Sequence, residues 1–302
     1  KIEGTKASIE EDLLPAEDIA PEKRDDQQEV RNYIKALNYG IKRILGDDFP
    51  LCNRLICEIH KLLLSGVRGK YKTPGEIRKS QNWIGGSKPS DAVYVPPSII
   101  ELPDLMSDFE KFINTDDWNV PNLIKIAILH YQFETIHPFL DGNGRIGRLI
   151  IPLYLLDKNM LSKPCFYISD FFEKHRTEYY DALNRVRLNN DLIGWIKFFL
   201  KAVIETAKSA KVKFKNVTDY VKDTEERALK LGGRPENILR VLRLFYDNPL
   251  LSSSVIAKET GISKGTVDNI IKKLYGDNIL VEVTGYSRNR LFALMDYLKI
   301  FI

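Results

Sequence analysis

The sequence predicts a mainly α-helical protein: a helical bundle that carries one β-hairpin, followed by a small α+β unit. Apolar residues recur at helical spacing in three long stretches, LIKIAILHYQFETI, RIGRLIIPLYLL and RTEYYDALNRVRLNND. Residues 73–97 combine β-forming residues with Gly-Gly and a Pro-Pro stop, which is typical of a hairpin or an irregular flap. The final run ILVEVTGYSRNRLFAL alternates as two strands about a turn at Gly285-Tyr286-Ser287. With 302 residues, 44% of them hydrophobic, the chain is long enough for two cores.

Changes in composition divide the chain into four parts. Residues 1–30 are acidic, residues 31–205 form the predicted bundle, residues 206–234 read as a charged helical linker and residues 235–302 form the small unit. The linker ends at a Gly-Gly-Arg-Pro break. In the small unit we expect three helices around a tight turn at Gly261-Ile262-Ser263, over Asn237–Tyr246, Ser252–Thr260 and Lys264–Tyr275.

Charge and cysteine content exclude several classes of partner. The net charge is only +4, so the whole chain does not indicate a strongly anionic partner. Three scattered cysteines, an odd number, favour reduced thiols and a cytoplasmic location. No apolar run approaches the length of a membrane span, so we expect no membrane partner.

The most informative stretch is HPFLDGNGRIGR, which runs from His137 to Arg148 between two of the predicted helices. A helix start presents unpaired N–H groups to an anion, and glycines at 142 and 144 let the backbone adopt positive φ and approach it closely. Arg145 and Arg148 lie on one side of the first helical turn and suit phosphate oxygens. Asp141 is a hard ligand suited to Mg²⁺, and His137 titrates near neutral pH.

Each of these features has a simpler explanation. A histidine before proline usually ends a helix, Gly-Asn-Gly is usually a turn, and two arginines in a helical turn usually face solvent. Their coincidence in one short loop favours a site that binds a nucleoside triphosphate and acts on its phosphates.

The loop resembles the signature of the Fic family, His-x-Phe-x-(Asp/Glu)-Gly-Asn-Gly-Arg-x-x-Arg, at every fixed position. The similarity extends from residue 1 to about residue 205 and includes HYQFETIHPF, GEIRKSQNWIGG and AVYVPP. Most Fic proteins are protein adenylyltransferases, a class of nucleotidyltransferase that moves AMP from ATP to a hydroxyl side chain of a target protein. Glycine at 144 favours this reaction over the phosphate transfer of the Doc toxin, which has lysine there.

The resemblance assigns roles to individual residues. It makes His137 the general base for the target hydroxyl and Asp141 the ligand of Mg²⁺, with ATP as substrate. It places Arg145 at the β-phosphate and Arg148 at the γ-phosphate. The nucleotide-binding set that it implies is Gly142, Asn143, Gly144, Arg145, Ile146, Gly147, Arg148, Tyr180 and Ile84.

Two of these assignments rest on less specific sequence. The flap from Thr73 to Pro97 would bind the target protein by strand addition, with Trp83, Ile84 and Gly85 covering the site; a surface hairpin with a buried tryptophan fits the composition equally well. Tyr180 is the expected nucleotide contact and Tyr179 the alternative, although tyrosines at helical spacing more often pack in a core.

The first residues suggest a switch. Many Fic proteins carry an inhibitory helix with the pattern (Ser/Thr)-x-x-x-Glu-(Gly/Asn), and Glu3-Gly4 matches its end. Glu3 would pair with Arg148 and keep ATP in an unproductive pose. An acidic, frayed terminus is the alternative, since residues 1–30 hold ten acidic and four basic side chains.

Residues 235–302 resemble a winged helix-turn-helix domain, with Ala257, Gly261 and Val267 at packing positions. Its third helix would enter a DNA major groove. However, residues 231–302 hold only ten basic against seven acidic residues, and Asp268 lies on that helix beside Lys264, Lys272 and Lys273. A protein-contact or dimerisation role is equally compatible, and a homodimer fits the sequence.

Other functions remain open. The chain could be a nucleotide-sensing transcription regulator that acts through the winged helix, or a de-AMPylase in which Glu3 positions water. A di-iron site that uses Glu134 and His137 would need a second Glu-x-x-His, which neither His60 nor His175 supplies.

Overall fold

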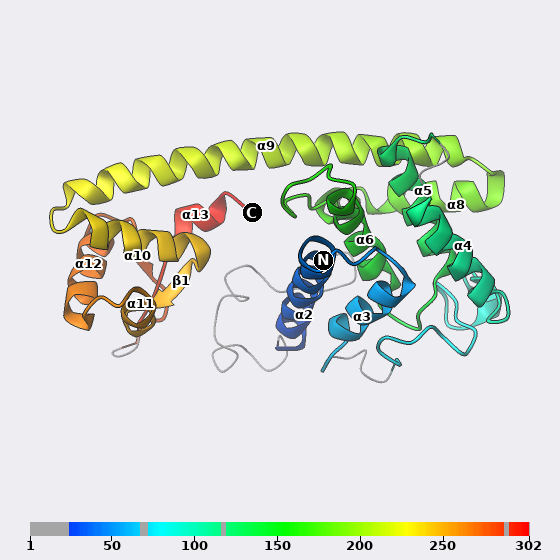
Figure 1. The fold of residues 1–302 in the computed structure, drawn as a ribbon, viewed down its shortest axis with the longest axis horizontal. Coiled ribbons are helices and arrows are strands. Elements are labelled where there is room, and N and C mark those ends of the chain that lie inside the picture. Colours follow the sequence, from blue (N-terminus) through cyan, green and yellow to red (C-terminus); the bar gives the residue numbers. More distant parts are fainter. Residues whose placement is uncertain (1–23, 67–71, 116–118, 287–289, 302) are drawn as a thin grey trace. The chain divides into compact units, whose positions relative to one another are not determined.

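The computed structural model describes residues 24–66, 72–115, 119–286 and 290–301. These residues fall into two compact units, one that ends at Lys208 and one that begins at Ser209. The predicted fold class is confirmed: helices dominate, and a small sheet lies in the second unit (Figure 1). None of the described helices is both long enough and apolar enough to cross a bilayer.

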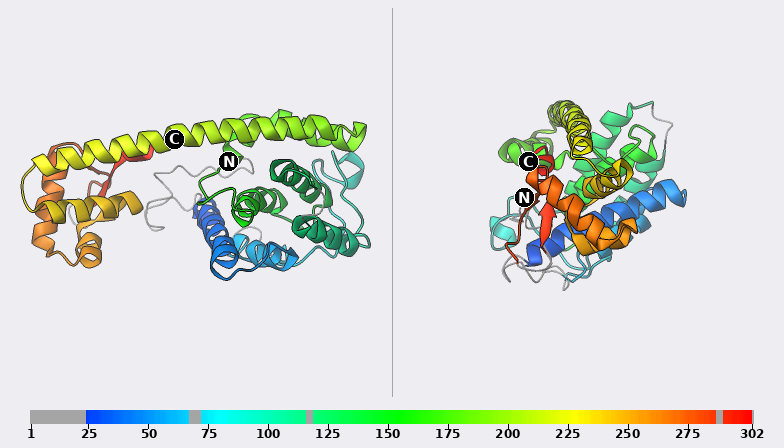
Figure 2. Two further views of the ribbon diagram at one scale, coloured as in Figure 1. Left: turned by 45° about the horizontal axis from the view of Figure 1, so that its top comes forward. Right: turned by 90° about the vertical axis from the view of Figure 1, so that its left-hand side faces the viewer.

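The first unit is a helical bundle. Its helices and helical turns are α2 (Arg24–Ile41), η3 (Lys42–Gly46), α3 (Asn53–Leu63), η5 (Pro89–Asp91), α4 (Leu102–Asn114), α5 (Asn122–Ile136), α6 (Asn143–Asp157), α7 (Ser169–Lys174), α8 (Arg176–Asn189) and the beginning of α9 (Leu192–Lys230). α2 and α3 lie side by side, and both contact α6 (Figure 2).

The centre of the bundle is the pair of contacting helices α5 and α6. Nearly every residue of α6 from Ile146 to Leu156 is buried, which explains why its sequence is apolar on all sides rather than on one stripe. His130 of α5 is fully buried and is surrounded by aromatic rings, including those of Phe172 and Trp195. The predicted loop between two helices therefore joins the two most buried helices of the unit.

The predicted helical linker is part of a longer helix. α9 runs without a break from Leu192 to Lys230, so it begins inside the bundle rather than at residue 206. Its first turns carry Trp195, whose indole N–H donates to the carbonyl of Ala127 at 2.7 Å. The beginning of α9 is thereby fixed to α5.

The second unit confirms the expected winged helix-turn-helix arrangement. It contains α10 (Pro235–Asp247), β1 (Leu250–Ser252), α11 (Ser253–Thr260), α12 (Lys264–Gly276), β2 (Val281–Glu282), β3 (Leu291–Ala293) and α13 (Met295–Lys299). The antiparallel sheet has the order β1-β3-β2. The sequence did not predict β1 or α13, which are too short to show a periodicity.

Of the three expected packing positions in this unit, two pack. Val267 is fully buried and Ala257 packs against the core. Gly261 does not pack: a Cβ there would meet nothing within 4 Å. Its φ of +67° ends α11 in the left-handed region, and this conformation is what favours glycine.

Candidate active site

The loop of residues 137–142 turns the chain sharply between α5 and α6. His137 ends α5 in the left-handed conformation, with φ 51° and ψ 58°, and its N–H donates to the carbonyl of Phe133 at 2.9 Å. Gly142 precedes α6 with φ 77°, as expected for a glycine at this turn. Gly144 differs from the expectation, because it lies inside the first turn of α6 without a positive φ.

Asn143 holds the loop closed. Its side-chain Oδ1 accepts the N–H of Phe139 at 2.8 Å, and its Nδ2 donates to the carbonyl of the same residue at 2.8 Å. The side chain is 2% exposed. The amide that we expected to face phosphate is therefore used in this structure to clasp the loop backbone.

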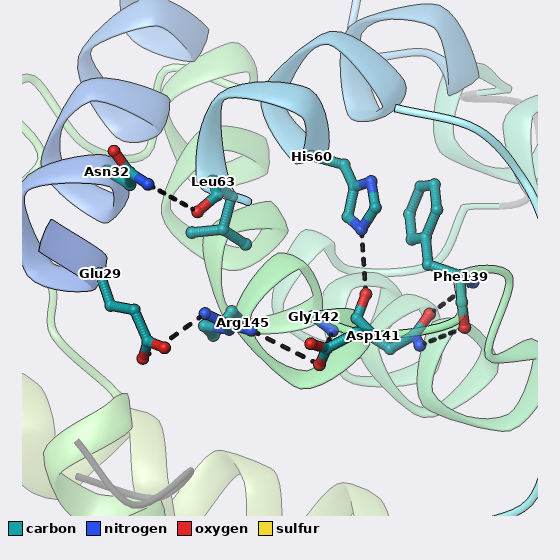
Figure 3. Close-up of polar contacts among 9 residues, drawn as sticks. Glu29, Asn32, His60, Leu63, Phe139, Asp141, Gly142 and Arg145 are labelled. Atoms are coloured by element: carbon teal, nitrogen blue, oxygen red, sulfur yellow. Dashed lines mark hydrogen bonds and ion pairs between the residues drawn. The ribbon is translucent and has the colours of Figure 1, made fainter. Parts of the chain in front are cut away.

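His60 of α3 supports the loop from the other side (Figure 3). Its ring stacks on Phe139, with centroids 3.8 Å apart, and its Nε2 lies 2.9 Å from the carbonyl oxygen of Asp141. The N–H of Gly75 donates to Nδ1 at 2.8 Å, so Nδ1 is an acceptor and Nε2–H is the donor. Burial lowers the pKa of His60 to about 4, which keeps the ring neutral at physiological pH.

Sequence analysis did not identify this role of His60. The available signal was its position on the buried face of α3, where Ile56, Ile59 and Leu63 are apolar. A polar residue on such a face needs a buried partner, but the partner is 81 positions away and only the fold brings it near.

The carboxylate of Asp141 lies beside the start of α6. Its Oδ1 accepts the N–H of Gly142 at 2.6 Å and lies 3.5 Å from Nη2 of Arg145. The side chain is 43% exposed. In the part of the chain that the structure describes, no group of three or more potential metal ligands occurs. One accessible carboxylate nevertheless fits Mg²⁺, which commonly binds one or two carboxylates together with substrate phosphates.

Both arginines of the motif border one face of α2. Nη1 of Arg145 lies 3.8 Å from Oε2 of Glu29, and Arg148 lines a small hollow with Tyr33 and Leu37. Glu29, Tyr33 and Leu37 are spaced four apart, so they share one side of α2. Arg148 is only 7% exposed. The two arginines therefore lie on one side of α6, as expected.

Ile146 and Gly147, two residues of the expected nucleotide-binding set, are both buried. The Ile146 side chain is 1% exposed in the core, and its N–H donates to the carbonyl of Gly142 at 3.0 Å. A Cβ at Gly147 would overlap the buried carboxylate of Glu134. The small Gly147 thus allows α5 and α6 to pack closely.

The two tyrosines of α8 have different environments. Tyr179 is 2% exposed, and its hydroxyl lies 3.0 Å from Nε2 of His130, so it belongs to the core. His130 also contacts the carbonyl of Gly147 through Nδ1 at 3.0 Å, and burial lowers its pKa to about 3. Tyr180 is 40% exposed and lies beside Arg176. Of the two, only Tyr180 is accessible to a ligand.

The segment Thr73–Pro97, the flap, forms a short hairpin with one antiparallel bridge, Ile84↔Tyr94. Ile84 is half-buried, and its N–H donates to the carbonyl of Tyr94 at 2.8 Å. Trp83 is 39% exposed and Val93 67% exposed, so the tryptophan is not the buried one of a simple surface hairpin.

The remaining expected residue, Glu3, lies outside the described residues, as do the other residues up to 23. Among the described residues, α2 brings the carboxylate of Glu29 to 3.8 Å from the motif residue Arg145, in addition to Asp141 of the loop itself.

Comparison with known protein families matches three segments of the chain. Residues 50–155 match the Fic/DOC family, and residues 1–42 match the Fic/DOC family N-terminal region. The chain carries a Fic/DOC family domain. Residues 234–280 match a winged helix-turn-helix DNA-binding family.

Several known proteins resemble the Fic domain. The protein adenylyltransferase Fic of Aedes aegypti is 31% identical over 176 residues, which are 58% of this chain and 32% of that protein. The protein of the same name from Culex quinquefasciatus is 29% identical over the same shares. The matched part is thus about a third of the length of these curated relatives.

Solved structures share the fold. A Fic family protein from Desulfovibrio desulfuricans G20 has a TM-score of 0.57 at 22% identity, with 97% of this chain and 82% of that chain covered. Fic-1 (aa134–508) from C. elegans has a TM-score of 0.53 at 22% identity, with 68% and 58% covered. At this identity the likeness concerns the fold alone.

Proposed function

We propose that this chain is an ATP-dependent protein adenylyltransferase that transfers AMP to a hydroxyl side chain of a target protein. The observation that carries the proposal is the loop between His137 and the first turn of α6, because buried contacts of Asn143 and His60 hold its backbone in one conformation at Phe139 and Asp141. The named activity of the curated relatives supports the same reaction.

In this proposal the first turn of α6 receives the phosphates of ATP. Backbone N–H groups at a helix start favour anions, and the small Gly144 leaves room for the nucleotide beside them. Arg145 and Arg148 supply positive charge along the same side of the helix, where charge accumulates on the leaving pyrophosphate. Asp141 would hold Mg²⁺, which neutralises phosphate charge when bound.

His137 acts as the base. Its imidazole takes the proton of the target hydroxyl as the hydroxyl oxygen attacks the α-phosphorus. The bond from the α-phosphorus to the bridging oxygen breaks, and pyrophosphate leaves with the electron pair. The target approaches along the flap, where a strand added at Ile84 and Tyr94 would bring its hydroxyl toward the loop.

The test compares the position of the label and one histidine. Wild type, His137→Ala and His175→Ala are incubated with a cell lysate and ATP labelled at either the α- or the γ-phosphate. Wild type and His175→Ala should label proteins from α-labelled ATP alone, since His175 lies elsewhere, beside Glu178. His137→Ala should lose this labelling. Equal labelling by wild type and His137→Ala contradicts the role of the base, and γ-label that wild type adds beyond the labelling by the lysate alone contradicts AMP transfer.

Autoinhibition by Glu3 forms part of the proposal. A carboxylate at Arg148 competes with the γ-phosphate, so Glu3→Gly should raise self-labelling with α-labelled ATP. Unchanged labelling contradicts the switch. If Glu3→Gly instead slows the loss of AMP from labelled protein, removal of AMP is the reaction that Glu3 supports.

DNA binding is a second candidate function, favoured by the surface of α12. Lys264, Thr266, Asn269 and Lys272 are exposed on this helix, as a groove-reading helix requires. Lys273 is not part of that surface, because its ammonium donates to the carbonyls of Leu231 and Gly232. A gel-shift assay with random duplex, with and without ATP, tests this: binding lost in Lys264→Ala supports it, and no shift at low salt contradicts it.

A further inference from the structure

Arg78 of the flap is a buried cation whose guanidinium, among the described residues, hydrogen-bonds to backbone carbonyls. It is 2% exposed, and its guanidinium donates to three carbonyls: Nε to His137 at 3.1 Å, Nη1 to Ser80 at 3.3 Å and Nη2 to Pro97. Among the described residues no carboxylate pairs with Arg78. Burying a charged side chain costs free energy unless the side chain is hydrogen-bonded. These three carbonyls therefore stabilise Arg78 in its buried position.

The three carbonyls belong to two segments, the flap and the start of the loop after α5, and the Arg78 guanidinium links these segments. Ser80 and Pro97 lie at the two ends of the segment that contains the Ile84↔Tyr94 bridge. His137 carries the imidazole of the proposed base. One planar guanidinium thus joins both ends of the flap to the backbone of the base, with a directional fork that an ammonium cannot reproduce.

Further flap contacts surround the same position. The backbone N–H of Arg78 donates to Pro138 at 2.8 Å, Nδ2 of Asn82 donates to Phe139 at 3.0 Å, and the Tyr94 hydroxyl donates to Thr135 at 3.0 Å. All three acceptors are carbonyl oxygens. The flap therefore hydrogen-bonds to the carbonyl of His137 and also to carbonyls before and after His137 in the chain.

The conformation of His137 makes this support necessary. Its left-handed backbone is uncommon for a residue with a side chain and persists where surrounding contacts determine it. The orientation of the peptide plane sets the direction of the Cα–Cβ bond and hence the place of the imidazole. Loss of the Arg78 contact would release that plane.

We propose that Arg78 is a positioning residue that fixes the backbone of His137 and links it to the flap. The distance and orientation between the base and a target chain bound to the flap would then stay constant. The inference rests on the proposed function for the roles of His137 and the flap. The contacts of Arg78 themselves do not depend on that function.

The test uses the full chain with Arg78→Lys and Arg78→Met, and with Lys79→Met as the matched control. Lys79 is the neighbouring residue, its side chain is 84% exposed, and its ammonium pairs with the surface residue Glu76. Tryptophan fluorescence first establishes that each variant is folded. Arg78→Lys keeps length and charge, so it remains informative if Arg78→Met does not fold.

Two measurements follow. Hydrogen–deuterium exchange without nucleotide should show faster exchange in peptides over 134–141 and 80–97 for the Arg78 variants, and no change for Lys79→Met. Labelling with α-labelled ATP should show a kcat lower by about 10- to 100-fold, because an error of about 1 Å in position has an effect of that size. The affinity for a non-hydrolysable ATP analogue should stay within about twofold of wild type, and Arg78→Lys should recover part of kcat.

The outcomes are separable from those of the proposed function. Unchanged exchange over 134–141 in a folded Arg78→Lys or Arg78→Met variant overturns the proposal, even where wild type transfers AMP. An equal fall in kcat and in analogue affinity also overturns it, because this indicates a general distortion of the site. If wild type transfers no AMP, the proposed function fails, and the exchange data still decide whether Arg78 holds this backbone.

Discussion

Replacing Asn143 by alanine separates two roles for its amide, loop clasp and phosphate contact. The change leaves the buried N–H of Phe139 without an acceptor, which costs about 1–3 kcal/mol. The carbonyl of Phe139 loses one donor but keeps Nδ2 of Asn82 at 3.0 Å, so this second loss is about 0.5–1.5 kcal/mol. The sum is about 1.5–4.5 kcal/mol in the free energy of unfolding without ligand.

Asn82→Ala is the matched control for this experiment. It removes only the second donor to the same carbonyl, so we expect a loss of about 0.5–1.5 kcal/mol. Urea denaturation followed by tryptophan fluorescence measures both variants. All three tryptophans, at positions 83, 118 and 195, precede Lys208, so the signal reports on the first unit alone.

The result that would refute the clasp is a ligand-free stability of Asn143→Ala within about 0.5 kcal/mol of wild type. A loss smaller than that of Asn82→Ala would refute it as well. In either case the amide would matter only through ATP, and the variant would differ from wild type in the stabilisation that added ATP produces.

Three further predictions concern the same unit. Burial lowers the pKa of His60 to about 4 and of His130 to about 3, so the unfolded chain binds protons below about pH 6.5 while the folded chain does not. The free energy of unfolding therefore has its full value above that pH and decreases as the pH drops toward 4, by up to about 4 kcal/mol at pH 5 for the two histidines together. Equal urea midpoints at pH 7 and pH 5 would rule this out. Gly147→Ala should destabilise the unit by about 1–2 kcal/mol, because the added methyl overlaps a buried carboxylate and this overpacking outweighs the helical preference of alanine; a raised midpoint in the same assay would disprove it. Glu29→Gln should tighten ATP binding by up to about fivefold in calorimetric titration, since it removes a carboxylate 3.8 Å from Arg145; weaker binding would count against Arg145 as a phosphate contact.

The sequence was sufficient for the helices and the loop but not for what supports the loop. The apolar periodicity of α5 and α6 and the glycine before α6 are local signals, and the structure confirms both elements. The partners of the loop, His60 and Arg78, lie 81 and 59 positions from the carbonyls that they bind, so no local pattern relates them.

Side-chain direction was also beyond the sequence. Tyr179 and Tyr180 are adjacent and chemically equal, yet packing turns one into the core and the other to the surface. Asn143 shows the same limit: an amide at a helix start can face either a ligand or the chain's own backbone, and the buried N–H and C=O of Phe139 decide for the backbone here.

The hydrogen bonds that join the flap to residues 135–139 end on backbone oxygens, so a substitution that inactivates the enzyme need not break them. Because these flap bonds do not involve the His137 imidazole, variants such as His137→Ala remove a functional group without removing any of the bonds. Such variants should keep the native path of the chain and the native flap. They are therefore suited to capturing target proteins, because a target that binds the flap of an inactive variant would remain bound and unmodified and could be identified.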